Sequence, residues 1–326
     1  MKLKIGIVGY GNVGRGVEKA IAQNPDTELA AVFTRRDPEK LKIETPGAKV
    51  CGLDCAEDMK DEIDAVILCG GSAKDLPEQG PKFASMFCTV DSFDTHSKIP
   101  EYLEVMDRAA KNTTAIVSVG WDPGLFSMMR VIGGAIIPDG AGYTFWGRGV
   151  SQGHSNAIRK LEGVKDAVQY TIPKEEAVNA ARSGLNPELS ARQKMERDCY
   201  VVAKKDADLE RLERIEREIK TMPDYFADYD TSVTFITEEE MAKDHSKMPH
   251  GGFVLHSGHT GENRQLMEFS LKLESNPEFT ACVLLAYARA AARMAKEGDF
   301  GAKTVLDVPL SYLSPKARNT LIKELL

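Results

Sequence analysis

Two aspartates could bind a cationic substrate group, because each follows a short apolar run typical of a buried strand. Asp94 lies in DSFDTH after Val90, and Asp122 lies in GWDPG after Val117. Ligands of open α/β sheets bind beyond the carboxyl ends of the strands, so both carboxylates are expected near one another there. Paired carboxylates suit an ammonium group, and either one can accept a proton as it is lost. Taken singly, each aspartate also fits a turn or a cap.

A glycine motif of the dinucleotide-binding type, GYGNVG, lies between an expected strand and an expected helix near the N-terminus. Gly9 permits the tight turn, Gly11 lets the backbone approach a pyrophosphate, and Gly14 lets the helix pack closely on the strand. The N-terminus of the helix then offers free N–H groups and a positive dipole to the phosphates. A glycine-rich turn without a ligand is the alternative, but strand, motif and helix occur in the required order.

The end of the second expected strand indicates which dinucleotide would bind. An NAD site places an acidic residue there, about 20 residues after the motif, to hold the ribose 2′-hydroxyl. This chain has Thr34-Arg35-Arg36 instead. Two guanidinium groups and a hydroxyl favour a 2′-phosphate, because arginine matches phosphate geometry and stays charged. The sequence therefore predicts NADP, with solvent-facing arginines at a strand end as the alternative.

The elements that must position these residues alternate between strands and helices over the first 120 residues, which predicts a parallel sheet with right-handed crossovers. The expected strands are 4–8, 29–33, 65–68, 89–92 and 115–118, and the expected helices include 13–23 and 99–111. The fold class is therefore α/β, a Rossmann-type doubly wound parallel sheet in the N-terminal half.

The rest of the chain has a different pattern, with glycine-rich segments, expected helices at 206–220 and 279–296, and alternating strands at 231–236 and 266–273. This pattern predicts an α+β lobe. With 326 residues the chain exceeds what one core usually supports. We expect a dinucleotide-binding domain at 1–120, with 300–326 able to complete it, and a second domain at 121–299.

Composition excludes several classes of protein. Hydrophobic residues make up 42% and charged residues 28%, which is ordinary for a globular protein. The net charge of −7 comes without a basic stripe for nucleic acid, and no apolar stretch approaches a membrane span. The first apolar run is too short for a signal peptide, so we expect a cytoplasmic protein. The 6 cysteines form no CxxC pair, which favours reduced thiols and no metal site.

Over nearly its whole length the sequence resembles the meso-diaminopimelate dehydrogenase family. The resemblance is carried by GYGNVG, TRR, CGGSAKDLPEQGP, DSFDTH, SVGWDPGLFS, YTFWGRGVSQGHS, MPHGG and LESNP. It implies a homodimer in which the second lobe, residues 121–299, binds substrate and forms the dimer. It also implies an enzyme that uses NADP to deaminate the D-centre of meso-2,6-diaminopimelate, yielding L-2-amino-6-oxopimelate, ammonia and NADPH. The reverse reaction serves lysine biosynthesis.

The resemblance also implies the site residues. Asp94 and Asp122 would hold the reacting amine, and one of them, directly or through water, would accept its proton. The D-centre would be framed by Trp146, Gln152 and Gly153, and the distal L-centre held by Thr171, Arg197, His250 and Asn276, with Arg197 pairing the far carboxylate. Contacts to NADP would come from Gly9, Gly11, Asn12, Val13, Gly14, Thr34, Arg35, Arg36, Gly71, Ser72, Ala73, Lys74, Ser92, Phe93, Asp94, Trp121, Asp122, Pro123 and Gly124.

Without the resemblance, several of these residues have ordinary interpretations. Arg197 stands on a charged, helix-like stretch and would be solvated, His250 would be a turn residue, and Thr171 would pack at the end of a strand. Asn156 departs from the family pattern, which has Asp after SQGHS. Two interpretations stay open: a weaker ammonium contact with a broader D-amino acid range, or a position that does not touch the substrate. Other NADP-dependent reductases, of the dihydrodipicolinate or homoserine type, and a non-catalytic NADP-binding regulator remain as alternatives.

Overall fold

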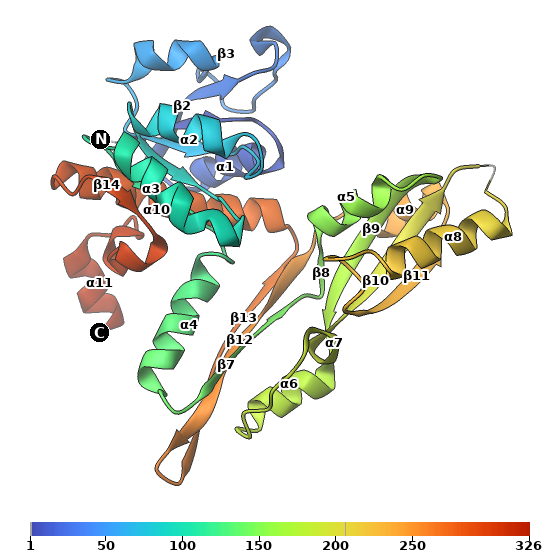
Figure 1. Ribbon diagram of the computed structural model, residues 1–326. Helices are drawn as coiled ribbons and strands as arrows, with labels where there is room; N and C mark the ends of the chain where they lie inside the picture. The colour runs from blue at the N-terminus through green and yellow to red at the C-terminus, as the bar shows by residue number, and fades with distance from the viewer. Residues whose placement is uncertain (1, 206) are drawn as a thin grey trace. The chain divides into compact units, whose positions relative to one another are not determined.

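The computed structural model describes residues 2–205 and 207–326. The chain forms two compact units (Figure 1). Unit 1 takes residues up to Met128 together with Pro277–Leu326, and unit 2 takes Met129–Asn276. The boundaries therefore differ from the expected 120 and 300. The C-terminal return begins earlier because the helix α10 (Asn276–Lys296) buries an alanine-rich face in the core of unit 1 rather than in unit 2.

Unit 1 contains a parallel sheet in the order β14-β6-β5-β4-β1-β2-β3, which matches the expected doubly wound fold. The chain order reverses between β1 and β4, and such a switch point is where open α/β sheets bind ligands. The strands are β1 (Leu3–Val8), β2 (Thr27–Thr34), β3 (Lys49–Gly52), β4 (Ala65–Leu68), β5 (Cys88–Asp91), β6 (Thr114–Ile116) and β14 (Gly301–Lys303).

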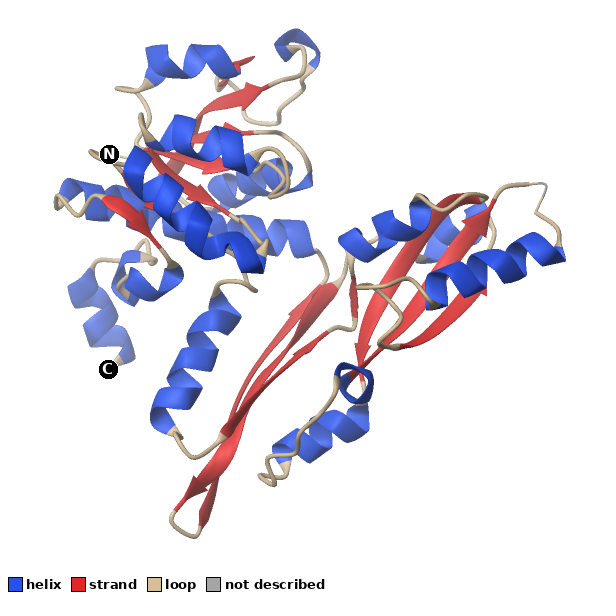
Figure 2. Ribbon diagram, in the orientation of Figure 1, coloured by secondary structure: helices blue, strands red, loops and turns tan. Residues whose placement is uncertain are grey.

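Helices cover both faces of this sheet (Figure 2). One face packs against α1 (Asn12–Gln23) and α10, and the other against α2 (Leu76–Ala84) and α3 (Ile99–Ala109). The strands are buried on both sides, which explains their continuous apolar runs. Shorter elements are η1 (Pro38–Lys40), η2 (Leu53–Met59), η3 (His96–Lys98), η4 (Val305–Asp307), η5 (Leu310–Tyr312) and α11 (Arg318–Leu325). The helix α4 (Leu125–Ile136) contains the boundary between the two units.

Unit 2 contains two sheets, in the orders β11-β10-β9-β8 and β13-β12-β7. Its strands are β7 (Ala141–Trp146), β8 (Gly149–Val150), β9 (Val164–Pro173), β10 (Met195–Ala203), β11 (Asp230–Phe235), β12 (His250–Thr260) and β13 (Asn263–Leu273). Its helices are α5 (Gln152–Arg159), α6 (Glu175–Arg182), α7 (Ala191–Lys194), α8 (Leu209–Lys220) and α9 (Glu238–Asp244). The expected α+β class is confirmed.

Each sheet of unit 2 buries apolar side chains under helices. Buried residues of α5 and α8, such as Ile158 and Ile215, pack on one face of the four-stranded sheet, and Met241 of α9 packs on the other. The expected helix at 206–220 begins at Leu209, because the Asp208 side chain caps it by accepting from the backbone N–H of Arg211 at 2.9 Å. Residue 206 lies outside the described residues.

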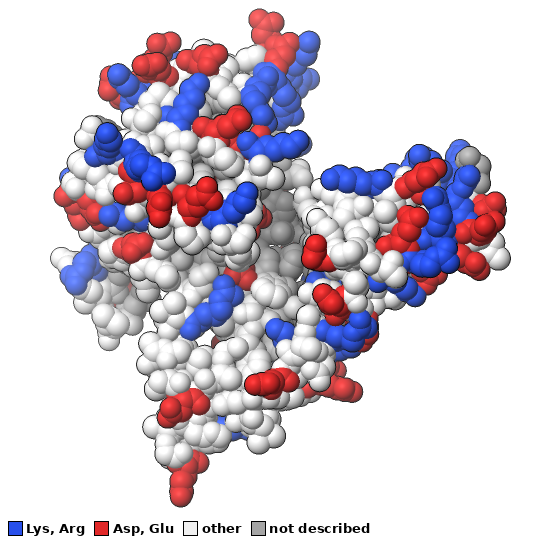
Figure 3. All heavy atoms as spheres, in the orientation of Figure 1, with Lys and Arg blue, Asp and Glu red and all other residues white. Residues whose placement is uncertain are grey.

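The described residues contain no helix long and apolar enough to cross a membrane. Acidic and basic side chains alternate over α8, as the face shown in Figure 3 illustrates. Pairs such as Glu216 with Lys220, 2.6 Å apart, account for this mixture on an exposed helix.

Candidate cofactor and substrate sites

The glycine turn between β1 and α1 has the geometry that a dinucleotide requires. Gly9 has a φ of +87°, a left-handed conformation that favours glycine. A Cβ on Gly14 would lie 2.3 Å from the carbonyl oxygen of Gly9, so only glycine allows this close packing of helix on strand. A Cβ on Gly11 would meet nothing within 4 Å. The open space beside Gly11, at the N-terminus of α1, is where a pyrophosphate could approach the backbone.

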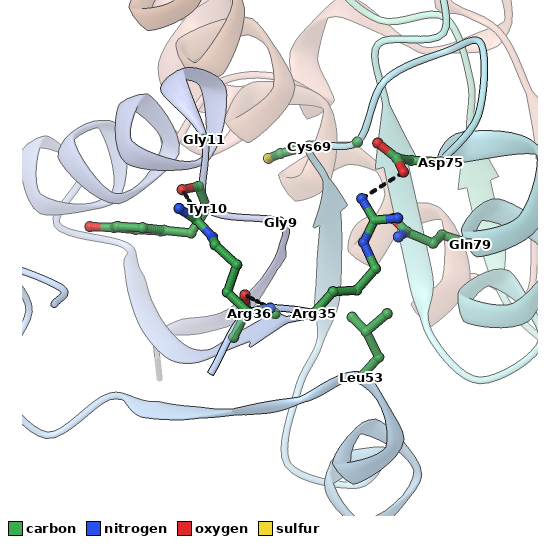
Figure 4. Close-up of a pocket in the computed structure, with 11 residues that line it drawn as sticks. Gly9, Tyr10, Gly11, Arg35, Arg36, Leu53, Cys69, Asp75 and Gln79 are labelled. Atoms are coloured by element: carbon green, nitrogen blue, oxygen red, sulfur yellow. Dashed lines mark hydrogen bonds and ion pairs between the residues drawn. The ribbon is translucent and has the colours of Figure 1, made fainter. Parts of the chain in front are cut away.

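A cavity of about 290 Å³ lies at the ends of β1, β2 and β4 and is bordered by the two predicted arginines (Figure 4). The guanidinium of Arg35 pairs with the Asp75 carboxylate at 2.7 Å, and its side chain is 66% exposed. The guanidinium of Arg36 donates to the carbonyl oxygen of Tyr10. The backbone N–H of Arg36 donates to Thr34 Oγ1 at 3.0 Å. The structure therefore brings Thr34, Arg35 and Arg36 to the glycine turn, as the sequence predicted.

Tyr10 and Glu18 fix the wall of this cavity, and neither was predicted from the sequence as a site residue. The Tyr10 hydroxyl donates to the buried Glu18 carboxylate, which also accepts from the backbone N–H groups of Glu44 and Thr45 at 2.9 and 2.6 Å. These hydrogen bonds lower the pKa of Glu18 despite its burial. A glutamate on the inner face of α1 is the signal that could have identified this anchor.

The loop after β4 reaches the loop after β5. The Asp75 carboxylate accepts from the backbone N–H of Gly71 at 2.9 Å, which closes the loop that contains Ser72, Ala73 and Lys74. The Ser72 hydroxyl accepts from the backbone N–H of Asp94 at 3.0 Å. The structure thus places the predicted Ser72 loop directly beside Asp94, whose side chain is exposed.

The loop after β6 lies next to the loop after β5. The backbone N–H of Val119 donates to the carbonyl oxygen of Asp91 at 2.8 Å. Trp121 is buried and packs edge-on against Phe126, with the ring centroids 5.2 Å apart. Asp122 is partly buried. The loops that carry Asp94 and Asp122 are therefore neighbours, as expected from the two strand ends.

In unit 2, the main feature of the predicted distal set is the buried side chain of Arg197, which is 6% exposed. Its guanidinium donates to Thr171 Oγ1 and lies over the ring of Tyr229, 3.9 Å from the centroid. Its Nε has no hydrogen-bond partner, and no carboxylate among the described residues forms an ion pair with it. A buried guanidinium without an anion is a feature of a site for a negatively charged ligand.

A polar chain continues from Thr171 away from Arg197. The amide of Gln169, fully buried, donates to Thr171 Oγ1 at 3.4 Å, and Gln169 Oε1 lies 3.0 Å from His154 Nδ1. Burial, together with the nearby charge of Arg197, lowers the pKa of His154 to about 4. The imidazole is therefore neutral near pH 7, and it adds no second positive charge beside Arg197. His154, Gln169 and Tyr229 were not predicted from the sequence as site residues.

The other predicted residues of unit 2 are positioned by short contacts of β8, of β12 and of Met248. Gly149 of β8 pairs with Thr171 of β9, and a Cβ on Gly149 would lie 2.5 Å from the His250 ring, so glycine lets β8 pack against the start of β12. Gly252, two residues after His250, pairs with Trp146. Met248 links the remaining two, because its sulfur lies 2.8 Å from Gln152 Nε2 and its carbonyl oxygen accepts from the backbone N–H of Asn276 at 3.0 Å.

Two local expectations for these residues were wrong. Arg197 lies on the strand β10, not on a helix, and it is buried rather than solvated. His250 begins the strand β12 instead of lying in a turn. Alternate positions of β10 are buried, namely Met195, Arg197, Cys199 and Val201. This is the period-two pattern of a strand, but it is hard to recognise in the sequence because one of the buried positions is a charged arginine.

Asn156 is exposed on α5, and its Oδ1 accepts from the Arg159 guanidinium at 2.8 Å. Arg159 also pairs with Asp166 at 2.7 Å. The departure from the family pattern therefore falls on a side chain that has its own partner at the surface of the helix. Gly153, also on α5, is exposed.

Comparison with known proteins matches residues 120–275 to the diaminopimelic acid dehydrogenase C-terminal domain. The chain is 60% identical to meso-diaminopimelate D-dehydrogenase of Ureibacillus thermosphaericus, over 100% of this chain and 99% of that protein. The chain belongs to the meso-diaminopimelate D-dehydrogenase family. The matched domain nearly coincides with unit 2.

Two solved structures support this assignment over the full chain. The diaminopimelate dehydrogenase of Corynebacterium glutamicum in complex with diaminopimelate has a TM-score of 0.91 and 46% identity, covering 100% of this chain and 99% of that one. An engineered D-amino acid dehydrogenase bound to NADP+ has a TM-score of 0.86 and 44% identity, covering 100% of both chains. The family resemblance inferred from the sequence motifs is confirmed.

Proposed function

We propose that this protein catalyses the NADP-dependent oxidative deamination of the D-centre of meso-2,6-diaminopimelate, giving L-2-amino-6-oxopimelate and ammonia in a reversible reaction. Family membership supports the reaction, and the homologue solved with diaminopimelate supports the substrate. The observation in this chain that carries the proposal is the buried, anion-free guanidinium of Arg197, because a substrate with a second carboxylate fits it.

The cofactor proposal rests on the cavity beside the glycine turn. Arg35 and Arg36 border it together with Thr34, and no acidic residue occupies the end of β2. These groups would hold the 2′-phosphate, and the N-terminus of α1 would hold the pyrophosphate. NADP, when bound, accepts the substrate α-hydrogen as hydride. To bind the phosphate, the Arg35 guanidinium must then either leave its ion pair with Asp75 or contact the carboxylate and the phosphate at the same time.

At the reacting centre, Asp94 and Asp122 would bind the substrate ammonium and one of them would take a proton from it. The amine must lose that proton before hydride can leave the carbon, and the resulting imine is then hydrolysed by water. A carboxylate can accept the proton directly or through water. The protein supplies orientation, binding and exclusion of solvent from the bound groups.

In the distal site, Arg197 would clamp the far carboxylate, and Thr171, His250 and Asn276 would bind the remaining polar groups of the L-centre. Burial lowers the pKa of His250, so this residue is a neutral hydrogen-bonding group near pH 7. Trp146, Gln152 and Gly153 would frame the D-centre. A neutral His154 leaves the single positive charge of Arg197 to match the single distal carboxylate.

The resemblance further supports a cytoplasmic homodimer acting in lysine biosynthesis. Sedimentation velocity of the purified chain tests the dimer, and a monomer at micromolar concentration would contradict it. Expression in a lysine auxotroph that lacks the other routes to diaminopimelate tests the pathway. Growth without lysine is expected, since only the reductive direction of this enzyme would then supply diaminopimelate.

The direct test of the function is NADP reduction at 340 nm with meso-, LL- and DD-diaminopimelate and D-alanine, with NAD as the control cofactor. Activity confined to the meso isomer with NADP is expected. Activity with D-alanine as well would indicate a broader D-amino acid dehydrogenase. Tight NADPH binding with no turnover of any amino acid would instead support a regulatory protein or another reductase.

A further inference from the structure

A buried carboxylate, Asp91, ends the strand β5 directly before the loop that carries Asp94. Its side chain is fully buried, and no cation among the described residues forms an ion pair with it. Burial raises the pKa of Asp91 to about 6, although its hydrogen bonds favour the ionised form and lower the pKa. A buried, unpaired carboxylate is costly unless its hydrogen bonds are satisfied, so the groups that bind it indicate what it does.

Three donors bind the Asp91 carboxylate, and they come from three separate segments. Oδ1 accepts from the backbone N–H of Phe93 at 2.9 Å and from the backbone N–H of Ser118 at 3.1 Å. Oδ2 accepts from the Tyr102 hydroxyl of α3 at 2.9 Å. One oxygen therefore joins the loop after β5 to the segment that continues β6, and the other anchors both to a helix.

The bound amides are close in the chain to the residues proposed to hold the amine. Asp94 directly follows Phe93, and Asp122 lies four residues after Ser118. Tyr102 also stacks on Phe93, with ring centroids 4.2 Å apart and an interplanar angle of 15°. Ser118 has a φ of +57°, a conformation that an ordinary residue holds only when its surroundings determine it.

We propose that Asp91 is a positioning residue that sets the separation of Asp94 and Asp122 by joining their two loops. This inference rests on the proposed function, in which those two carboxylates hold the reacting amine. A displacement of about 1 Å between reacting groups can lower a rate about 100-fold. The carboxylate acts through its geometry as a double acceptor, and its negative charge is not required.

The test compares Asp91→Ala with Asp91→Asn. The alanine variant removes both loop hydrogen bonds and leaves two buried N–H groups unpaired. The asparagine variant keeps Oδ1 as the double acceptor and presents its amide to the Tyr102 hydroxyl, which can accept. We expect kcat/KM for meso-diaminopimelate to fall about 100-fold in Asp91→Ala and to stay within about fivefold of wild type in Asp91→Asn. The Kd of NADPH should rise in Asp91→Ala and stay within about threefold of wild type in Asp91→Asn, because both loops also carry residues expected to contact NADP.

A matched control is Asp64→Ala. Asp64 directly precedes β4, at the amino-terminal ends of the strands, where its carboxylate accepts from the backbone N–H of Lys4 at 2.8 Å. Its kcat/KM should match wild type. If Asp91→Ala does not fold, Tyr102→Phe replaces it, because this variant keeps the ring on Phe93 and removes one donor. A fall of about tenfold is expected there, and unchanged activity would overturn the proposal.

Hydrogen exchange of the amides at 92–96 and 117–122 reports on the two loops independently of activity. Faster exchange in Asp91→Ala and near-native exchange in Asp91→Asn are expected. Equal loss of activity in both variants would show that the negative charge of Asp91 is required. Full activity in Asp91→Ala would show that the two loops do not need the hydrogen bonds to Asp91. Either result overturns the inference. If the wild-type enzyme does not turn over diaminopimelate, the proposed function fails, whereas unchanged exchange in Asp91→Ala refutes the positioning role by itself.

Discussion

Replacing Arg197 by methionine should separate substrates that have a distal carboxylate from those that do not. The guanidinium is buried, donates to Thr171, stacks on Tyr229 and has an unpartnered Nε. A bidentate carboxylate clamp adds two hydrogen bonds to a charged group, each of about 1.5–3 kcal/mol. Losing about 3 kcal/mol of binding raises KM on the order of 100-fold, since 1.4 kcal/mol corresponds to a factor of ten.

The assay measures kcat and KM for meso-diaminopimelate and for D-alanine with saturating NADP. D-Alanine has no second carboxylate, so its kcat/KM should change less than about threefold. The matched control is Arg192→Met, which removes an exposed arginine that pairs with Asp230 at 2.6 Å on the same unit. Similar losses on both substrates would refute the distal role of Arg197 and would point to a general disturbance of the lobe.

Stability gives a second readout for the same variant. Removing one partner of a buried ion pair usually destabilises a protein by about 3–5 kcal/mol, because the other charge is left unpaired. Arg197 has no carboxylate partner among the described residues, so Arg197→Met should change the free energy of unfolding by less than about 1 kcal/mol without ligand. A loss of several kcal/mol in urea denaturation would mean that Arg197 serves the fold rather than a ligand.

Three further predictions concern the cofactor site and the partly buried His154. Replacing Arg35 and Arg36 together by serine should raise the KM for NADP about 100-fold and leave that for NAD within about threefold; unchanged preference would remove both from the site. Gly11→Ala should keep the wild-type Tm and weaken NADPH binding at least tenfold, whereas Gly14→Ala should lower the Tm because its Cβ meets backbone; the reverse order would refute this account of the turn. The pKa of His154 lies near 4 in the fold and near 6.5 when unfolded, so the unfolding free energy should fall as pH drops from 6.5 to 4, by up to about 3 kcal/mol, and His154→Gln should flatten this slope; an equally steep slope in that variant would contradict the assignment.

The sequence by itself determined the parallel sheet, the glycine turn and the cofactor type, because these depend on local patterns. Continuous apolar runs, a motif of fixed spacing and a basic strand end need no tertiary information to be interpreted. The placement of Asp94 and Asp122 on neighbouring loops was predictable for the same reason, since strand ends of a parallel sheet share one edge. The family followed from motifs spread over the whole chain.

Only the tertiary structure decided the environment of Arg197 and the role of α10. An arginine in a buried, alternating strand looks polar in sequence, and its burial depends on Thr171 and Tyr229, which are 26 and 32 residues away. The helix α10 has an apolar face that could pack on the core of either unit. Its packing on the sheet of unit 1 is what assigns it to unit 1. Asp91 was concealed for the same physical reason: a buried polar group is defined by donors that the fold brings to it, and two of the three come from other segments.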